Sequence, residues 1–161
     1  MIVTAQMPPF PDTLQFIFDT GSSGISLDSS TAAYLGLQPV YSGYAIRGVG
    51  GIRKVPFVNG RSLQLGSIRA DSLDFHVNDY SVLTSVYGVR IDGIIGYSLL
   101  SRYVIRIDQE LQQMDWFAAG VNVYPRRGYR MKLEIDKLPS HAAYVQDVRG
   151  EQSRFLIDLG A

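Results

Sequence analysis

The strongest constraint on the fold is a short apolar segment that ends in an acid and a glycine, because this pattern occurs near both ends of the chain. Residues 16–18 are Phe-Ile-Phe, and residues 19–21 are Asp-Thr-Gly. Residues 155–157 are Phe-Leu-Ile, and residues 158–160 are Asp-Leu-Gly. Such an apolar run favours a buried strand, and the glycine permits a tight turn at its end. Each pattern therefore predicts a carboxylate at the tip of a strand, positioned for acid-base chemistry.

The rest of the sequence is typical of an all-β domain with one or two short helices. Its 161 residues include sixteen glycines and ten tyrosines, and Pro, Gly, Asn and Asp separate its short apolar runs. A chain of this length can bury a sizeable core. The expected strands are residues 3–7, 14–18, 63–65, 70–78, 91–96 and 103–108, with a hairpin over 44–58. A helix is expected over 31–35, with Asp28 near its start and Gly36 at its end, and a helical turn after Gly96.

Charge and composition exclude several classes of partner. Fifteen basic and fifteen acidic residues cancel, and the longest basic runs are the pairs Arg53-Lys54 and Arg126-Arg127. We therefore expect no nucleic acid and no membrane surface as a partner. The absence of cysteine excludes disulfides and thiolate metal sites. No apolar stretch reaches the length of a membrane span.

The start of the chain leaves the cellular compartment open. Residues 1–6 carry neither the basic segment nor the apolar stretch of a signal peptide. An alternating strand is expected directly after Met1. One interpretation is therefore that Met1 is an initiator placed where a leader was removed, as in an exported protein.

Residues 124–128, Tyr-Pro-Arg-Arg-Gly, interrupt the strand pattern. After them, residues 143–146 followed by 154–161 are similar to residues 3–6 followed by 15–22, which indicates a repeat. We therefore expect one unit over residues 1–118, a linker over 119–131, and the opening strands of a second, truncated unit over 132–161.

Three elements, taken together, give residues 1–118 a resemblance to a known family. They are Asp19-Thr20-Gly21-Ser22, the glycine-rich hairpin tip Gly48-Val49-Gly50-Gly51, and Ile94-Ile95-Gly96 followed by Leu99-Leu100. In this order and approximate spacing, with strands between them, they resemble a retropepsin-like aspartic protease lobe of the pepsin superfamily. The resemblance implies a closed, barrel-like β fold.

The resemblance also implies roles for the first acid turn. Asp19 would supply one carboxylate of a dyad that shares a proton and holds a water for peptide hydrolysis. Thr20 would turn its hydroxyl toward the opposite turn, and Gly21 would let the backbone pass close to the carboxylate. Ser22 is expected to donate a hydrogen bond to ionised Asp19 and so lower the acid limb of the pH profile. No cofactor and no metal are implied.

Two further elements would shape the site by the same resemblance. Residues 48–51 would form a flap, a hairpin that closes over an extended peptide and excludes water. Residues 94–96 would cross behind the catalytic turn as a buttress. Simpler interpretations stay open: an ordinary hairpin tip for residues 48–51, a plain buried strand for 94–96, and a capping turn for residues 19–21.

The second acid departs from the family pattern. Asp158 is followed by Leu159, where the family has the threonine whose hydroxyl grips the opposite turn. Two sources of a second carboxylate are therefore open. Asp158 could complete an intramolecular pair in a two-lobed parent protein, whereas a second Asp19 from a homodimer is the simpler source in this chain.

Other sites are rejected on their spacing. Residues 48–51 do not form a dinucleotide loop, because Arg53 stands where a third glycine would be and no helix pattern follows. His76 and His141 lack the spacing of metal ligands and are expected at a surface or an edge strand. Residues 157–160 are similar to a phosphate loop of actin-like kinases, but no second phosphate motif occurs.

The sequence thus predicts an aspartic endopeptidase that hydrolyses extended, largely apolar peptide segments or unfolded proteins. It would act as a homodimer or with a second lobe in its parent chain. The alternative is a non-catalytic peptide-binding or assembly module that keeps the fold but has lost its second acid, which Leu159 makes credible.

Overall fold

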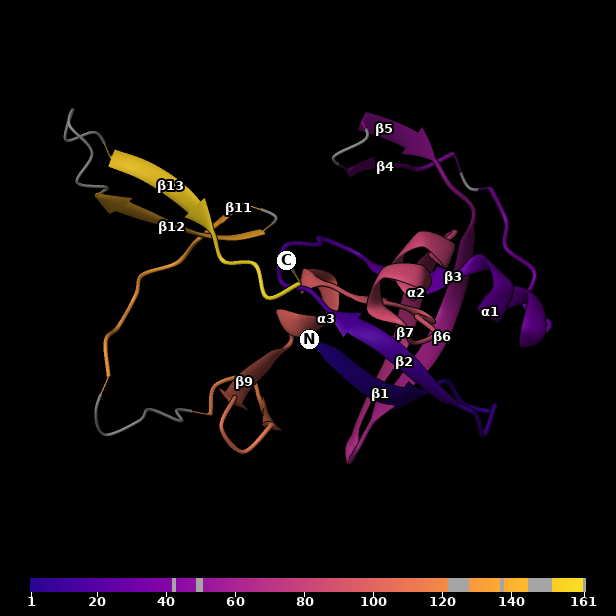
Figure 1. The fold of residues 1–161 in the computed structure, drawn as a ribbon, viewed down its shortest axis with the longest axis horizontal. Helices are drawn as coiled ribbons and strands as arrows, with labels where there is room; N and C mark the ends of the chain where they lie inside the picture. Colours follow the sequence, from indigo (N-terminus) through magenta and orange to yellow (C-terminus); the bar gives the residue numbers. More distant parts are fainter. Residues whose placement is uncertain (42, 49–50, 122–127, 137, 145–151, 161) are drawn as a thin grey trace.

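A six-stranded closed barrel forms the larger part of the protein (Figure 1). The computed structural model describes residues 1–41, 43–48, 51–121, 128–136, 138–144 and 152–160. The barrel strands are β1 (Ile2–Gln6), β2 (Thr13–Phe18), β3 (Ile25–Asp28), β6 (Phe57–Leu65), β7 (Ile68–Asn78) and β8 (Gly93–Ile95). Their order around the barrel is β1-β2-β8-β3-β7-β6. The expected all-β fold is confirmed.

Strand β2 is buried on both faces, which explains its continuous apolar run. Phe16 and Phe18 point into the main core, whereas Ile17 packs with Tyr80 and Ile91 in a second cluster. β2 pairs antiparallel with β1 and parallel with β8, so it has no free edge. A strand with neighbours on both edges and apolar contacts on both faces holds the residue after it firmly.

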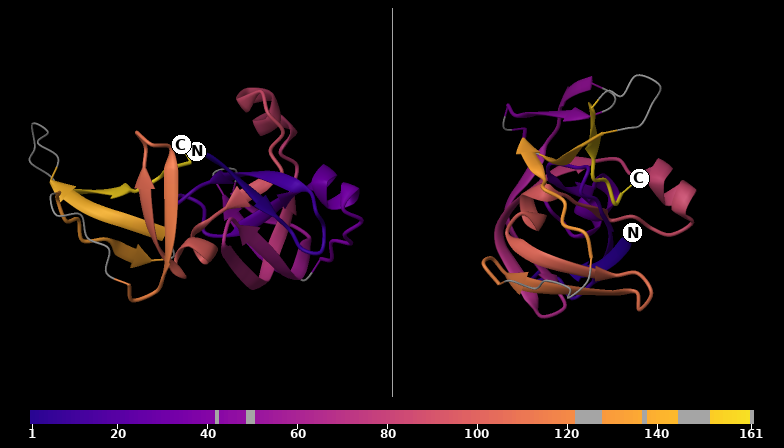
Figure 2. Two further views of the ribbon diagram at one scale, coloured as in Figure 1. Left: turned by 90° about the horizontal axis from the view of Figure 1, so that it is seen from below. Right: turned by 90° about the vertical axis from the view of Figure 1, so that its left-hand side faces the viewer.

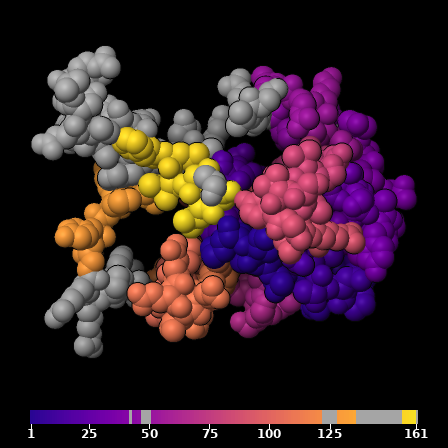
Figure 3. Space-filling model, viewed as in Figure 1, coloured from indigo at the N-terminus to yellow at the C-terminus, as the bar shows by residue number. Residues whose placement is uncertain are grey.

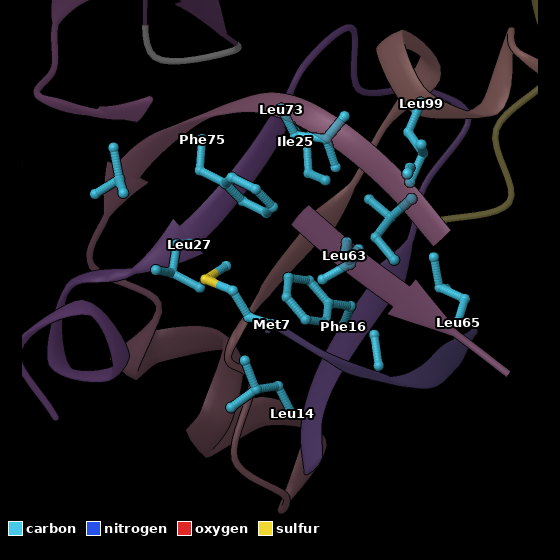
Figure 4. Packing of buried hydrophobic residues seen from close by; sticks show 14 of the residues in the cluster. Met7, Leu14, Phe16, Ile25, Leu27, Leu63, Leu65, Leu73, Phe75 and Leu99 are labelled. Atoms are coloured by element: carbon cyan, nitrogen blue, oxygen red, sulfur yellow. The ribbon is translucent and has the colours of Figure 1, made fainter. Parts of the chain in front are cut away.

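The main core fills the barrel interior (Figure 4). Its largest fully buried side chains are those of Phe16, Phe18, Phe75, Met7, Leu27, Leu63, Ile95 and Leu99. They come from strands on every side of the barrel and from the segment after β8. The core therefore fixes β2 and β8 relative to each other, and both strands lead to the candidate site.

Three short helices accompany the barrel in the part of the chain that the structure describes. α1 (Ser29–Tyr34) begins at Asp28, whose carboxylate accepts hydrogen bonds from the N–H groups of Ser30 and Thr31, as an N-cap does. α3 (Tyr97–Leu100) follows β8 directly. α2 (Ser81–Tyr87) was not expected, because its sequence is rich in β-branched residues and has no side-chain cap. None of the helices in the described ranges has the length and apolar character needed to cross a bilayer.

Two hairpins extend from the barrel. β4 (Ala45–Gly48) and β5 (Gly51–Lys54) form one of them, and β9 (Tyr103–Asp108) and β10 (Gln113–Ala118) form the other. The second hairpin is anchored by Trp116, whose ring lies edge-on to Phe18 at 6.1 Å and to Tyr103 at 5.5 Å. Such ring pairs add to the burial of the apolar surface.

A three-stranded sheet lies beside the barrel and consists of β11 (Glu134–Asp136), β12 (Leu138–Tyr144) and β13 (Gln152–Leu156). In both views of Figure 2 the end of the chain leaves this sheet and returns to the barrel near the N-terminus. The space-filling view shows the same end segment against the N-terminal residues (Figure 3). The sheet therefore delivers the second acid turn to the barrel.

The hairpin β12–β13 repeats the pairing of β1–β2. Leu156, two residues before Asp158, pairs with Ser140, as Ile17 pairs with Ile2 two residues before Asp19. In this register the counterpart of Ala143 is Ala5, not Val3 as the sequence comparison suggested. The difference is two residues, which preserves the face of every side chain because a strand has a period of two.

Removal of the Phe16 ring should strongly destabilise the barrel. Phe16 is fully buried in the main core, so Phe16→Ala should lower the free energy of unfolding by about 3–5 kcal/mol in urea denaturation. Val86→Ala is the control, because Val86 is 75% exposed and its truncation should cost less than about 0.5 kcal/mol. Equal effects of the two substitutions would contradict this account of the core.

Candidate active site

The first acid turn is held by backbone hydrogen bonds on both sides of Asp19. The Asp19 N–H donates to the carbonyl oxygen of Ile95 at 3.0 Å. The Oδ1 atom of Asp19 accepts from the N–H groups of Gly21 at 2.7 Å and Ser22 at 3.2 Å. The carboxylate therefore has a fixed orientation at the end of β2.

Strand β8 and the residues after it lie directly behind this turn. Ile94 and Ile95 pair with β2, and the N–H of Tyr97 donates to the Ser22 carbonyl oxygen at 2.7 Å. A side chain at Gly96 would collide with the carbonyl oxygens of Ser22 and Gly24. Ile94, Ile95 and Gly96 therefore lie behind the Asp19 turn, and their role as a buttress stays a prediction.

The second acid turn has the same local form as the first. The N–H of Gly160 donates to Oδ1 of Asp158 at 2.8 Å, just as Gly21 does to Asp19. The Asp158 side chain is largely exposed, whereas that of Asp19 is half-buried. Both carboxylates thus sit on an Asp-X-Gly turn that follows a strand.

The Thr20 hydroxyl joins the two turns. Its Oγ1 donates to the carbonyl oxygen of Ile157 at 2.5 Å and accepts from the N–H of Leu159 at 3.0 Å. The two bonds bracket Asp158 on the residues before and after it. The hydroxyl uses both its donor and its acceptor capacity, and it fixes the second turn through backbone groups alone.

Each glycine lies under the carboxylate of the opposite turn. A Cβ atom added to Gly21 would lie 2.6 Å from Cγ of Asp158, and one added to Gly160 would collide with the carboxyl group of Asp19. Glycine is therefore required at both positions for close approach. The backbone at Gly21 does lie close to a carboxylate, as expected. That carboxylate belongs to Asp158, in the opposite turn.

The structure brings together two carboxyl groups that the sequence separates by almost the whole chain. Burial is the main cause that raises the pKa of Asp19, and the hydrogen bond and charge of Asp158 raise it further. Hydrogen bonds from Gly21 and Ser22 act in the opposite direction. The proximity of Asp158 therefore favours the protonated form of Asp19.

Of the two expected sources of a second carboxylate, the structure of the single chain places Asp158 opposite Asp19. A second Asp19 from another copy stays a prediction. Sequence reasoning placed weight on the lost hydroxyl at Leu159. It missed that the backbone N–H of Leu159 makes a bond to Thr20 that requires no particular side chain.

Ser22 acts differently from the expectation. Its backbone N–H, not its hydroxyl, donates to Asp19, and the hydroxyl donates to the carbonyl oxygen of Gly24 at 3.4 Å. The geometry of the turn explains this, because Oδ1 of Asp19 faces the N–H groups of the residues two and three positions on. The hydrogen bond expected from the Ser22 side chain is therefore absent, and a backbone bond takes its place.

The glycine-rich hairpin is present, but part of its tip lies outside the described residues. Gly48 pairs with Gly51, which has a φ of 98° that favours glycine. Val49 and Gly50 are not among the described residues. The ribbon shows the β4–β5 hairpin standing away from the barrel (Figure 1).

Asp92, a buried acid that was not among the predicted site residues, connects the strands that lead to the site. Asp92 is 3% exposed and accepts hydrogen bonds from the N–H of Gln15 at 2.8 Å and the hydroxyl of Thr31 at 2.7 Å. Arg90 forms an ion pair with it at 2.8 Å. Asp92 thereby ties the start of β8 to β2 and α1. A lone acid inside the apolar segment 91–96 was the signal that could have revealed it.

His76 is half-buried in the barrel. His76 lies in β7, which pairs with β6 and β3, so it is not on an edge strand as expected. Burial lowers its pKa. In the described part of the chain no group of three His, Cys, Asp or Glu side chains is arranged to hold a metal ion.

The raised pKa of Asp19 predicts a pH-dependent cost to stability. In the unfolded chain this carboxyl titrates near 3.8. The folded state therefore holds the proton more tightly, and stability falls as the pH rises from that value through the folded pKa. Asp19→Asn should remove this loss, so its advantage over the wild type in thermal unfolding should grow as the pH is raised.

Asp71→Asn is the control, because the pKa of Asp71 is lowered in the folded state whereas that of Asp19 is raised. Hydrogen bonds from Ser62 and Arg69 lower the pKa of Asp71, so its charged form favours the folded state. Asn at this exposed position should slightly reduce stability above the acid range. A parallel response of the two variants would contradict the assignment of the raised pKa to Asp19.

Ser22→Ala should leave the titration of Asp19 unchanged. The substitution keeps the N–H that donates to Oδ1 and removes only the hydroxyl that donates to Gly24. The measurement is the pH dependence of the carboxyl ¹³C shift of Asp19. A rise in its pKa in the variant would instead indicate that the hydroxyl contacts the carboxylate.

Comparison with known proteins identifies a family for this chain. The sequence profile of a family described as aspartyl protease matches residues 12–99, more than half of the chain. A crystal structure of a retropepsin-like aspartic protease from Rickettsia conorii is similar, with 23% identity over 68% of this chain and 84% of that chain and a TM-score of 0.49. None of the curated proteins matches significantly. On the strength of the profile match, which includes the Asp19 turn and β8, the chain belongs to the aspartyl protease family.

Proposed function

We propose that this chain is an endopeptidase in which Asp19 and Asp158 form one catalytic dyad. The observation that carries the proposal is the reciprocal packing of the two turns. Each carboxylate lies over the glycine of the other turn, and the Thr20 hydroxyl bonds the backbone on both sides of Asp158. This arrangement supports a pair held in register by the chain itself.

The proposed chemistry is acid-base activation of water. One proton shared by the two carboxyl groups leaves one acid ionised and the other protonated. The ionised carboxylate takes a proton from the attacking water, and the protonated one gives its proton to the carbonyl oxygen of the peptide. The raised pKa of Asp19, which burial causes mainly and Asp158 increases, supports this division, because Asp19 then keeps its proton to a higher pH.

The proposed substrate is an extended peptide. A substrate segment would lie between the acid turns and the β4–β5 hairpin, with its backbone paired as an added strand. Gly48 ends β4 and Gly51 begins β5. Glycine at these positions gives the backbone the freedom that a moving flap needs. Unfolded proteins and flexible loops are the sources of such segments.

We further propose that residues 132–161 are the opening strands of a second lobe, after a lobe over 1–118 and a linker over 119–131. The matching register of β12–β13 and β1–β2 supports this division. The outer edge of β13 has no partner strand among the described residues, whereas β2 has β8 in that place. A parent protein with two lobes would supply the missing partner.

Hydrolysis of a denatured protein at acidic pH tests the proposed function. Asp19→Asn and Asp158→Asn should each lower kcat by at least about 10²-fold, because each removes one acid of the dyad. A statine-type inhibitor should block the wild type. Asp115→Asn is the control, since Asp115 pairs with Arg106 on the β9–β10 hairpin, and it should retain activity.

The concentration dependence separates the two sources of the second acid. An intramolecular dyad gives a specific activity that does not change with protein concentration, whereas a homodimer loses activity on dilution. Full activity of Asp158→Asn together with loss on dilution would favour two Asp19 residues from two copies. Peptide binding without turnover, unaffected by Asp19→Asn, would favour a non-catalytic binding module.

A further inference from the structure

Leu159 occupies the position in the second turn that Thr20 occupies in the first, and the two side chains make different contacts. Thr20 reaches across to the backbone of the second turn, but Leu159 has no hydroxyl to reach back toward the first. Hydrogen bonding by side chains is therefore one-sided. The second turn needs another contact if Asp158 is to keep its place opposite Asp19.

The side chain of Leu159 makes that contact with the barrel core. It is partly buried and packs against the main hydrophobic cluster, although it follows a sheet that lies outside the barrel. Two other large apolar residues of the same segment are exposed, Phe155 by 46% and Leu156 by 45%. Ile157 is partly buried, but it is not among the residues that pack against the main cluster. Within residues 155–160, the leucine after the acid is the apolar side chain inserted toward the barrel core.

The two contacts of Leu159 act on the same short turn. Its N–H donates to Thr20 at 3.0 Å, and its side chain lies against the core. Asp158, the preceding residue, faces Gly21 and Asp19. A turn fixed at both its backbone and its side chain has little freedom to rotate the carboxylate away.

We propose that Leu159 is a positioning residue that holds Asp158 against Asp19 by anchoring the second acid turn in the core of the first lobe. This inference rests on the proposed dyad. An apolar contact thus takes over the task that a second hydroxyl would perform. It also favours the chain's own second turn over a second copy, because an Asp19 turn carries Thr20 and not leucine at this place.

Leu159→Ala and Leu159→Met test the proposal. Alanine removes the anchor but keeps the backbone N–H, so Asp158 should lose its fixed distance from Asp19. In carboxyl ¹³C titrations the pKa of Asp19 should fall, because Asp158 contributes to raising it. In hydrolysis, kcat should drop by about 10-fold or more with KM little changed, since substrate binding is not the lost contact. Methionine has nearly the volume of leucine and should restore both values.

Leu156→Ala is the matched control. Leu156 is the same residue type three positions earlier, on the same segment, but it is 45% exposed. Its truncation should change neither the Asp19 titration nor kcat. Leu159→Val, which removes one methylene group, should give intermediate values and decides the question if the alanine variant does not fold.

The proposal is overturned if Leu159→Ala, or Leu159→Val in its place, titrates and turns over like Leu156→Ala. It is also overturned if methionine fails to restore the titration. Failure of the proposed function looks different. In that case the wild type would not hydrolyse the substrate, while the Asp19 titration would still respond to Leu159→Ala and not to Leu156→Ala.

Discussion

The hydroxyl of Thr20 is the interaction on which the candidate site depends. It donates to the carbonyl oxygen of Ile157 and accepts from the N–H of Leu159, so one side chain fixes the residues on both sides of Asp158. Without this bond, the second turn would be held near the barrel by the apolar contact of Leu159 and by a long hydrogen bond from the Met1 ammonium group to the Leu159 carbonyl oxygen, at 3.4 Å. The rest of the fold can be understood as the support that keeps Thr20 in position, because β2 ends directly before its turn and β8 lies behind it.

The site combines a firm scaffold with an unfavourable pair of charges. Glycines at positions 21 and 160 allow the turns to approach until each carboxylate lies over the opposite backbone. Burial raises the pKa of Asp19, and the hydrogen bond and charge of Asp158 raise it further, so ionisation of both acids is costly. The apolar core under β2 offsets that cost, as functional sites commonly require of the surrounding structure.

Local signals in the sequence predicted much of the fold, whereas long-range contacts escaped it. Asp28 marked the start of α1, the glycine after Asp19 marked the acid turn, and residues 103–108 form β9 as expected. α2 was missed because valine and threonine favour strands. β10 was missed because its alternation covers only residues 113–116 before the apolar Phe117 and Ala118. Asp19 and Asp158 meet because the end of the chain returns to the barrel, and no local sequence pattern encodes this return. No pattern showed either that the backbone N–H of Leu159 would bond to Thr20 where the second turn lacks a hydroxyl.

The most direct test of the account is the separation of the Asp19 and Asp158 carboxyl groups in a crystal structure of the chain at acidic pH. The account predicts that the two groups of one molecule face each other within hydrogen-bonding reach of a single water, with Thr20 bonded to the backbone beside Asp158. It would be contradicted by a second turn that lies away from the barrel, or by an Asp19 that faces the Asp19 of another copy.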